Sequence, residues 1–190
     1  MKILMGLGNP GAQYAHSRHN VGFMVLDAFA KSLAVSFHKT SSRMVTASGT
    51  IHDRSRNDIQ VVLAKPQSYM NRSGPATLEL LRETEAGPAD LVVIHDDLDL
   101  SLGRLRLKSR GGHGGHRGVQ SIIASLQTHQ FYRLRVGIGR PPADQAAEEY
   151  VLSVFLPEEK SVVQAMIERS VMALDCFLKE GPETTMNRFH

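Results

Sequence analysis

The sequence predicts an α/β fold, a layered domain in which a sheet is covered by helices. Short apolar runs typical of strands alternate along the chain with longer segments whose apolar residues recur at helical spacing. The chain has 190 residues, of which 42% are hydrophobic, and this is enough to bury one sizeable core. Its glycines and prolines fall between these segments, with no repeat, linker or low-complexity stretch. We therefore expect a single domain over residues 1–190.

The first half of the chain alternates strands and helices. Residues 2–7 (KILMGL) have the pattern of a buried opening strand, and residues 20–34 that of a helix with an apolar stripe. A strand pattern returns at 59–64, and a helix is predicted at 75–84. The apolar run 91–95 predicts a strand that leads into the acidic turn His95-Asp96-Asp97.

The second half continues the alternation. Strands are predicted at 104–108 and 133–138, and helices at 115–127 and 158–179. Cys176 falls on the apolar stripe of the last helix, which predicts a buried thiol. Functional sites in such folds gather at the ends of strands, so polar residues at these ends are the first candidates for chemistry.

Basic residues are concentrated in one part of the chain. The formal net charge is only +3, but the segment Ser101–Ala143 contains no Asp or Glu. Its basic residues are Arg104, Arg106, Lys108, Arg110, Arg117, Arg133, Arg135 and Arg140. In RLRLK (104–108) the cations alternate with leucines and so share one face of a strand. This segment predicts a polyanionic partner, unless acidic residues from elsewhere in the fold neutralise it.

Cysteine usage and hydropathy limit the location. Cys176 is the only cysteine, so no intramolecular disulfide can form and a reducing compartment fits best. The start MKILMGLGNPG shows no cleavage-site pattern, and no apolar stretch approaches the length of a membrane span. We expect a soluble cytoplasmic protein that does not associate with membranes.

A glycine-rich turn follows the first strand. Gly6-Leu-Gly8-Asn-Pro-Gly11 matches the dinucleotide fingerprint G-x-G-x-x-G, which would indicate a nucleotide-binding oxidoreductase. In that motif, however, a helix begins within the glycines, whereas here the helical pattern starts only near Asn20. The alternative is a rigid turn that presents Asn9, whose amide can donate and accept hydrogen bonds.

His19 and Asp96 are the candidates for acid–base chemistry. His19 precedes the first predicted helix, where a side chain can project from the core. Asp96 follows a buried strand, and a carboxylate beside a histidine fixes its tautomer and stabilises its charged form. The alternatives for the acidic turn are a Mg²⁺ site and simple turn formation, and those for His19 are capping and packing.

Two loops offer groups that bind substrates. In 65–74, Tyr69 can stack on a base or sugar, and Asn71 can bind a peptide group or an oxyanion, although the loop could also only cap the next helix. The glycines of 111–118 lead into a predicted helix and could cradle a phosphate beside Arg117 and Lys108, or could serve only a tight turn. The spacing of His113 and His116 could suggest a metal, but no acid or cysteine accompanies the two residues in sequence.

Covalent catalysis has no visible nucleophile in this sequence. There is no Gly-x-Ser-x-Gly elbow and no Walker A motif. A histidine, a carboxylate, amide donors and a basic segment together favour attack by water on an electrophile that is attached to a polyanion.

Four ordered motifs resemble one family, the bacterial peptidyl-tRNA hydrolases. These motifs are GLGNPGAQYAHSRHNVGF, KPQSYMNRSG, HDDLDLSLGRLRLK with GGHGGHRG, and RLRVGIGRP, and the closing MNRFH is similar too. The resemblance covers nearly the whole chain. It implies an α/β fold around a central mixed β-sheet flanked by helices, and a monomer without cofactor, metal or obligate protein partner. The implied activity is hydrolysis of the ester that joins a peptide to tRNA.

The resemblance also implies roles for individual residues. By motif position, His19 is the general base, Asp96 supports it, and Asn9 contacts the peptide. The expected contacts with the peptide or tRNA are Tyr14, Asn20, Tyr69, Met70, Asn71, Lys108, Arg117 and Arg135.

Two positions depart from the family pattern. Arg117 stands where well-studied members carry asparagine, and Arg110 replaces the first glycine of a usual triplet. Arg117 could bind a phosphate where asparagine would hydrogen-bond, or its presence could weaken peptide positioning. A catalytically silent RNA-binding module on the same fold is therefore the alternative function.

Overall fold

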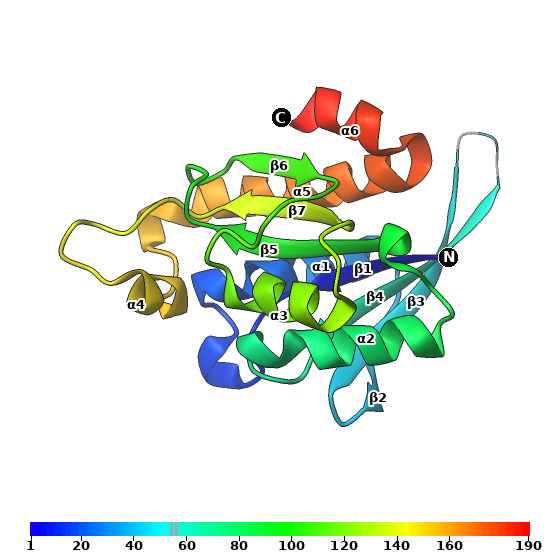
Figure 1. The fold of residues 1–190 in the computed structure, drawn as a ribbon. Helices are drawn as coiled ribbons and strands as arrows, with labels where there is room; N and C mark the ends of the chain where they lie inside the picture. Colours follow the sequence, from blue (N-terminus) through cyan, green and yellow to red (C-terminus); the bar gives the residue numbers. More distant parts are fainter. Residues whose placement is uncertain (54, 56) are drawn as a thin grey trace.

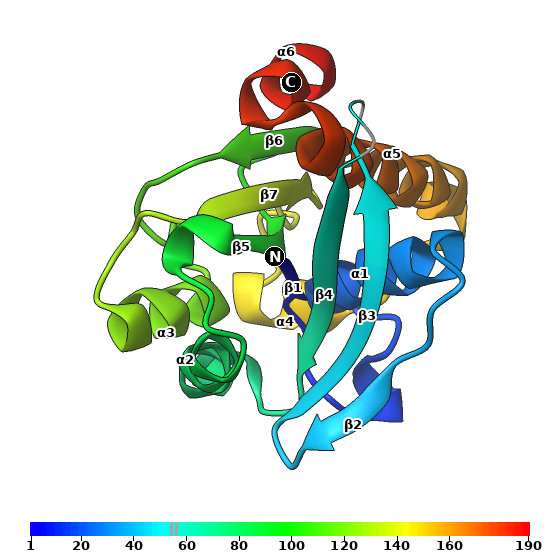
Figure 2. The same cartoon turned by 90° about the vertical axis from the view of Figure 1, so that its right-hand side faces the viewer.

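The computed structural model describes all residues except 54 and 56, and its centre is one seven-stranded mixed sheet (Figures 1 and 2). The strand order is β2-β3-β4-β1-β5-β7-β6. Strands β4, β1, β5 and β7 run parallel, whereas β2, β3 and β6 pair antiparallel with their neighbours. The strands are β1 (Lys2–Gly6), β2 (His38–Ser41), β3 (Met44–His52), β4 (Asp58–Pro66), β5 (Leu91–Asp97), β6 (Leu105–Lys108) and β7 (Tyr132–Gly137).

Helices cover both faces of the sheet (Figure 2). Helices α1 and α5 pack on one face around Leu26 and Phe29, and α2 and α3 on the other around Met5 and Ile122. None of the described helices is both long and apolar enough to span a membrane. The helices are α1 (Val21–Ser32), α2 (Ser73–Glu83), α3 (Arg117–Leu126), α4 (Ala147–Leu152), α5 (Lys160–Glu180) and α6 (Pro182–Phe189).

The sequence prediction of an α/β fold is confirmed, and each expected strand and helix is present with ends that agree or are shifted by at most two residues. Four elements were not predicted: β2, β3, α4 and α6. Strand β3 was missed because polar, small residues such as Ser48, Gly49 and Thr50 interrupt its alternation. Helix α4 has only six residues, too few for a helical period to show.

The glycines of the first turn serve close packing. A Cβ atom on Gly6 would lie 2.4 Å from the carbonyl oxygen of Gly22 in α1, and one on Gly8 would lie 2.8 Å from the ring of Phe23. Helix α1 begins at Val21, ten residues after Gly11. The helix therefore does not begin within the glycine turn, as it does in a dinucleotide-binding unit.

The edge strand β6 is covered at one point by the segment that follows α6. The backbone N–H of Leu107 donates to Nε2 of His190 across 3.0 Å. Helix α6 lies along the same edge (Figure 1). His190 thus takes the place of a partner strand at this position of β6.

Candidate active site

A cavity of about 720 Å³ opens at the carboxyl end of β5, which is the end where sites of such folds gather. Its walls come from the turn after β1, the loop after β4, the glycine loop before α3, and α4. A cavity of this size accommodates a nucleotide or a short peptide. The lining residues used below are Asn9, His19, Tyr69, Met70, Asn71, His95, Asp96, His116, Arg117 and Glu148.

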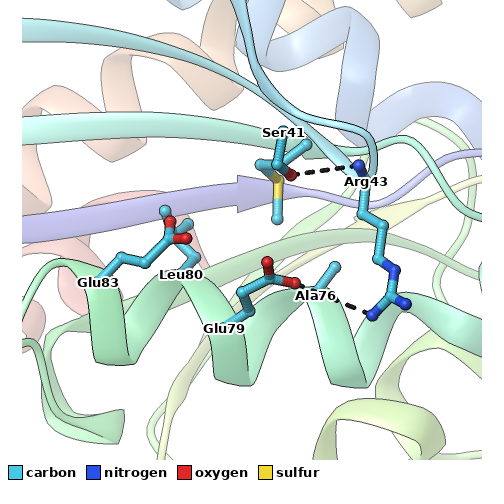
Figure 3. A pocket seen from close by; sticks show the side chains of 7 residues that line it. Ser41, Arg43, Ala76, Glu79, Leu80 and Glu83 are labelled. Atoms are coloured by element: carbon cyan, nitrogen blue, oxygen red, sulfur yellow. Dashed lines mark hydrogen bonds and ion pairs between the residues drawn. The ribbon is translucent and has the colours of Figure 1, made fainter.

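A second hollow lies between α2 and the β2–β3 turn (Figure 3). Its volume is about 10 Å³, which is room for no more than a water molecule. Figure 3 shows Arg43 reaching toward Glu79 of α2, with 3.9 Å between the guanidinium and the carboxylate. The large cavity is therefore the candidate site.

His19 and Asp96 meet in the wall of this cavity. Nδ1 of His19, in the 3₁₀ turn η2 (Arg18–Asn20), lies 2.8 Å from Oδ1 of Asp96 in β5. Burial by itself would raise the pKa of Asp96, but the opposing effects of His19 and His116 outweigh it and hold that pKa far below its usual range. Because the ionised carboxylate can only accept, Nδ1 of His19 carries the proton, and Nε2 remains as a basic nitrogen.

His116 is a second donor to the same carboxylate oxygen. Its Nε2 lies 2.9 Å from Oδ1 of Asp96, and its ring centroid lies 4.9 Å from that of His19. Nδ1 of His116 accepts from the backbone N–H groups of Gly118 and Val119 and so caps α3. This cap fixes the tautomer, because a nitrogen that accepts cannot carry the proton, and Nε2 must therefore donate.

The cap of α3 by His116 also argues against two ligands that the sequence left open, a metal ion and a phosphate. Ligand atoms of His19, Asp96 and His116 lie within 4.8 Å of one another, close enough to surround a metal ion. A protonated Nε2 of His116 does not ligate a cation, so the arrangement favours a hydrogen-bonded triad. A phosphate cradle at the start of α3 is likewise disfavoured, because His116 already accepts from two of the free N–H groups.

His95 packs against this triad and contacts both His116 and the backbone of Asp96. It is buried, its Nδ1 donates to the backbone carbonyl of Asp96 across 2.7 Å, and its ring meets that of His116 edge to face. Burial, together with the charge of His116, lowers the pKa of His95 to about 3. His95 is therefore a neutral packing residue at physiological pH, and the base facing the cavity is His19.

Asn9 is held by Asn20 and Met70. The backbone of Asn9 exchanges two hydrogen bonds of 2.9 Å with the Asn20 amide, and Oδ1 of Asn9 accepts from the backbone N–H of Met70. This acceptor role fixes the amide orientation, and among the described residues its Nδ2 group donates to none, so it is available to a ligand.

The sequence-based expectation that Asn20 contacts the substrate needs correction. Its side chain is buried, and both ends of its amide are engaged with Asn9. Asn20 therefore supports Asn9 from behind the cavity wall.

Comparisons with known proteins agree with this geometry. A match to the family described as peptidyl-tRNA hydrolase covers residues 3–190. The peptidyl-tRNA hydrolase of Dehalococcoides mccartyi is 47% identical over the full length of both chains, and that of Mycobacterium tuberculosis is 45% identical over 99% of this chain and 96% of its own. This chain belongs to the peptidyl-tRNA hydrolase family.

Solved structures of the family have the same fold. The peptidyl-tRNA hydrolase of Acinetobacter baumannii superposes with a TM-score of 0.88, at 31% identity, over 100% of this chain and 94% of its own. A complex of peptidyl-tRNA hydrolase with N-propanol gives a TM-score of 0.89 at 29% identity, with the same coverage. The family likeness therefore extends over the entire sheet and its helices.

The residues expected to contact the peptide or tRNA fall into two groups. Tyr69, Met70, Asn71 and Arg117 line the cavity, with Tyr69 59% exposed at its rim. Lys108 and Arg135 lie outside it, on β6 and β7, and Tyr14 is in the turn that follows the first glycines. The structure thus separates residues that line the cavity from residues on strands β6 and β7.

The basic surface is a strip formed by Arg106, Lys108 and Arg135. Arg106 faces Arg135, and Lys108 faces Arg133, as register pairs across β6 and β7. Arg135 and Arg106, together with partial burial, lower the pKa of Lys108, which reports a local excess of positive charge. Arg133 is buried and donates to the carbonyls of Gly111 and Gly112, so it holds the glycine loop.

Part of the basic segment is neutralised by acids from elsewhere, as the alternative interpretation of the sequence expected. Arg135 pairs with Asp97 at 2.5 Å, Arg140 pairs with Asp99 at 2.5 Å, and Arg117 pairs with Glu148 of α4. The ion pair of Arg117 connects α3 to α4 at the opening of the cavity. Arg117 is the position where the family usually has asparagine.

Two functional positions were missed by sequence reasoning. His116 was set aside because no acid accompanied it in sequence, but Asp96 reaches it from β5, twenty residues earlier. Arg18 was passed over as a neighbour of His19, and its acidic partner lies 141 residues away. Only the unusual concentration of polar residues in 17–20, just before a buried helix, signalled that these side chains have partners.

Proposed function

We propose that this chain hydrolyses the ester between a peptide and the 3′ end of tRNA, with His19 as the general base. The observation that carries the proposal is the 2.8 Å contact of Nδ1 of His19 with the ionised Asp96, which leaves Nε2 as a base at the cavity. The same pairing of imidazole and carboxylate activates nucleophiles in other hydrolases.

The reaction follows from the groups around the cavity. Nε2 of His19 takes a proton from water, and the resulting hydroxide attacks the ester carbonyl carbon. The amide N–H groups of Asn9 and Asn71 donate to the oxyanion of the tetrahedral intermediate. The intermediate collapses with release of the 3′ oxygen of tRNA, which takes the proton from His19. Asp96 stabilises the charged imidazole between these steps.

The tRNA is recognised by the basic strip, in this proposal. Lys108 and Arg135 bind its phosphates while Tyr14 and Tyr69 contact its 3′ end, which places the ester in the cavity. The enzyme acts as a cytoplasmic monomer without cofactor or metal, and its product is free tRNA.

The test is release of N-acetylated amino acid from N-acetyl-aminoacyl-tRNA in EDTA, with unblocked aminoacyl-tRNA for comparison. We expect cleavage of the blocked substrate only, abolished by His19→Ala. The matched control is His52→Ala, because Nδ1 of His52 contacts Asp58 at 2.7 Å in an exposed hairpin remote from the cavity. Tight RNA binding without cleavage would favour the silent RNA-binding module, and near-normal turnover of His19→Ala would overturn the mechanism.

A further inference from the structure

Arg18, the residue before His19, has its charge buried in the protein. Its side chain is 3% exposed, and its guanidinium donates to both carboxylate oxygens of Glu159, at 3.1 and 2.6 Å. The guanidinium carbon lies 4.3 Å from the ring centroid of Tyr150 and 4.8 Å from that of Phe155. A planar cation stacked on two rings and bound at both ends of one carboxylate has a single well-defined position.

The partners of Arg18 belong to α4 and to the segment that follows it. Besides the side-chain contacts, the backbone N–H of Arg18 donates to the carbonyl of Ser153, and Ser17 pairs with Val154 in an isolated bridge. Tyr150 in turn donates its hydroxyl to the carbonyl of Ile138, just beyond β7. The turn that carries His19 therefore contacts, through Arg18, a segment that is itself hydrogen-bonded to the residue after β7.

Consecutive residues of this turn are held from different directions. Arg18 is bound to the 150–159 segment, His19 to β5 through Asp96, and Asn20 to the first glycine turn through Asn9. All three residues are buried, although all three are polar. The backbone between these anchors has little freedom, so a change at one anchor moves its neighbour.

We infer that Arg18 is a positioning residue for the reaction, and that its ion pair with Glu159 sets the place of His19 against Asp96. This inference rests on the proposed function of His19. Arg18 does not line the cavity, so it acts through the peptide backbone that it shares with His19. Displacement of a base by about 1 Å lowers turnover by as much as a hundredfold.

The chemistry of the pair makes lysine a poor replacement for Arg18. An ammonium group has no plane to stack between Tyr150 and Phe155, and it cannot donate to both oxygens of Glu159 in parallel. Loss of one partner also leaves the other charge buried without compensation. Both Arg18→Lys and Glu159→Gln should therefore shift the turn while keeping side chains of similar size.

The experiment compares Arg18→Lys, Glu159→Gln and the double variant with Arg43→Lys and Glu79→Gln. The control pair has the same residue types but is exposed and does not line the large cavity (Figure 3). We measure kcat and KM for N-acetyl-aminoacyl-tRNA at a temperature where every variant is folded, and the NMR signal of the His19 Nδ1 proton.

The expected result is a loss of kcat of roughly tenfold to a hundredfold in either site variant, with KM changed by less than about twofold. The Nδ1 proton signal of His19 should shift or broaden, the double variant should lose no more than the worse single one, and the controls should match wild type. If Arg18→Lys does not fold, the kcat and the His19 signal of Glu159→Gln provide the test.

Two results would overturn the inference. One is a lowered unfolding temperature with unchanged kcat and an unchanged His19 signal, which would make the pair purely structural. The other is a change confined to KM that differs between an acetylated amino acid and a longer peptide, which would place the effect in the α4 wall. Activity retained by His19→Ala would instead overturn the role of His19 as the base, and absence of cleavage by the wild type would overturn the proposed function, so these failures are distinguishable from failure of the inference on Arg18.

Discussion

His116 donates its Nε2–H to Oδ1 of Asp96 across 2.9 Å. The same carboxylate oxygen is within 2.8 Å of the nitrogen that carries the proton of His19. Two imidazoles thus hold one buried carboxylate, and the second donor keeps that oxygen aligned when His19 takes up a proton during the reaction. This arrangement predicts that removal of His116 affects turnover as well as folding.

Substitution of His116 separates its two roles. His116→Asn keeps an acceptor for the start of α3 but cannot reach Asp96, whereas His116→Ala loses both contacts. We expect both variants to lose roughly tenfold in kcat, the value of one hydrogen bond to a charged group. Only His116→Ala should also lose about 1 kcal/mol of unfolding free energy in urea denaturation. Normal kcat in His116→Asn would show that the contact with Asp96 does not matter.

The buried His95 makes stability depend on pH. Its pKa is about 3 in the folded protein against 6.5 when unfolded, so between these values the unfolded chain binds a proton that the folded chain does not. The unfolding free energy should therefore fall by about 1 kcal/mol for each pH unit below 6.5. Above pH 6.5, His95 should add no pH dependence to the unfolding free energy.

Comparison with His95→Gln isolates this contribution. Urea unfolding between about pH 4.5 and 6.5 is informative, since Asp96 is ionised in both states there. The unfolding free energy of the variant should depend less steeply on pH than that of the wild type. Below about pH 4 the loss of the Asp96 contribution adds to both proteins, because that group has a lowered folded pKa. Equal slopes for the two proteins would contradict a neutral His95 in the fold.

The ion pair between Arg117 and Glu148 predicts an unusual salt dependence. Both side chains are largely exposed, so the pair contributes at most about 1 kcal/mol to stability. Glu148→Gln should free Arg117 for a phosphate and steepen the dependence of log KM on log salt by about one phosphate contact. Arg117→Asn, which introduces the residue usual in the family, should keep the wild-type slope. Glu149→Gln, next to it on α4, serves as control.

Lys108 is expected to act on tRNA binding alone. Lys108→Ala should raise KM and leave kcat unchanged, and the salt slope should fall by about one, as for the loss of a single phosphate contact. The control is Lys39→Ala, an exposed lysine on β2 at the opposite edge of the sheet. A fall in kcat at saturating tRNA would instead place Lys108 in the chemistry of the cavity.

Local sequence patterns predicted the parallel centre of the sheet and the edge strand β6, but not the two strands β2 and β3 at the opposite edge. The runs that form β1 and β5 are almost continuously apolar because helices cover both of their faces. Strand β3 lies between β2 and β4, and its outer residues are small and polar, so no clear period marks it. Its place is decided by nine register pairs with β4, the strand that follows it in the chain.

The same limit applies to the site. His19 and Asp96 could be proposed because each lies at the end of a recognisable element within a known motif. Their separation of 77 residues, and the approach of His116 from a third element, are properties of the sheet order alone. Arg18 and Glu159 illustrate this further, since nothing in either local sequence shows that the two charges meet in the interior.

The contact of Leu107 with His190 has a practical consequence for the sheet edge. An uncovered edge strand invites strand addition and aggregation, and β6 is the edge that carries Arg106 and Lys108. A purification tag fused after His190 would press on this imidazole and on the strand beneath it. For work on RNA binding, an affinity tag therefore belongs before Met1, which precedes the central strand β1 and not the edge strand β6 (Figure 1).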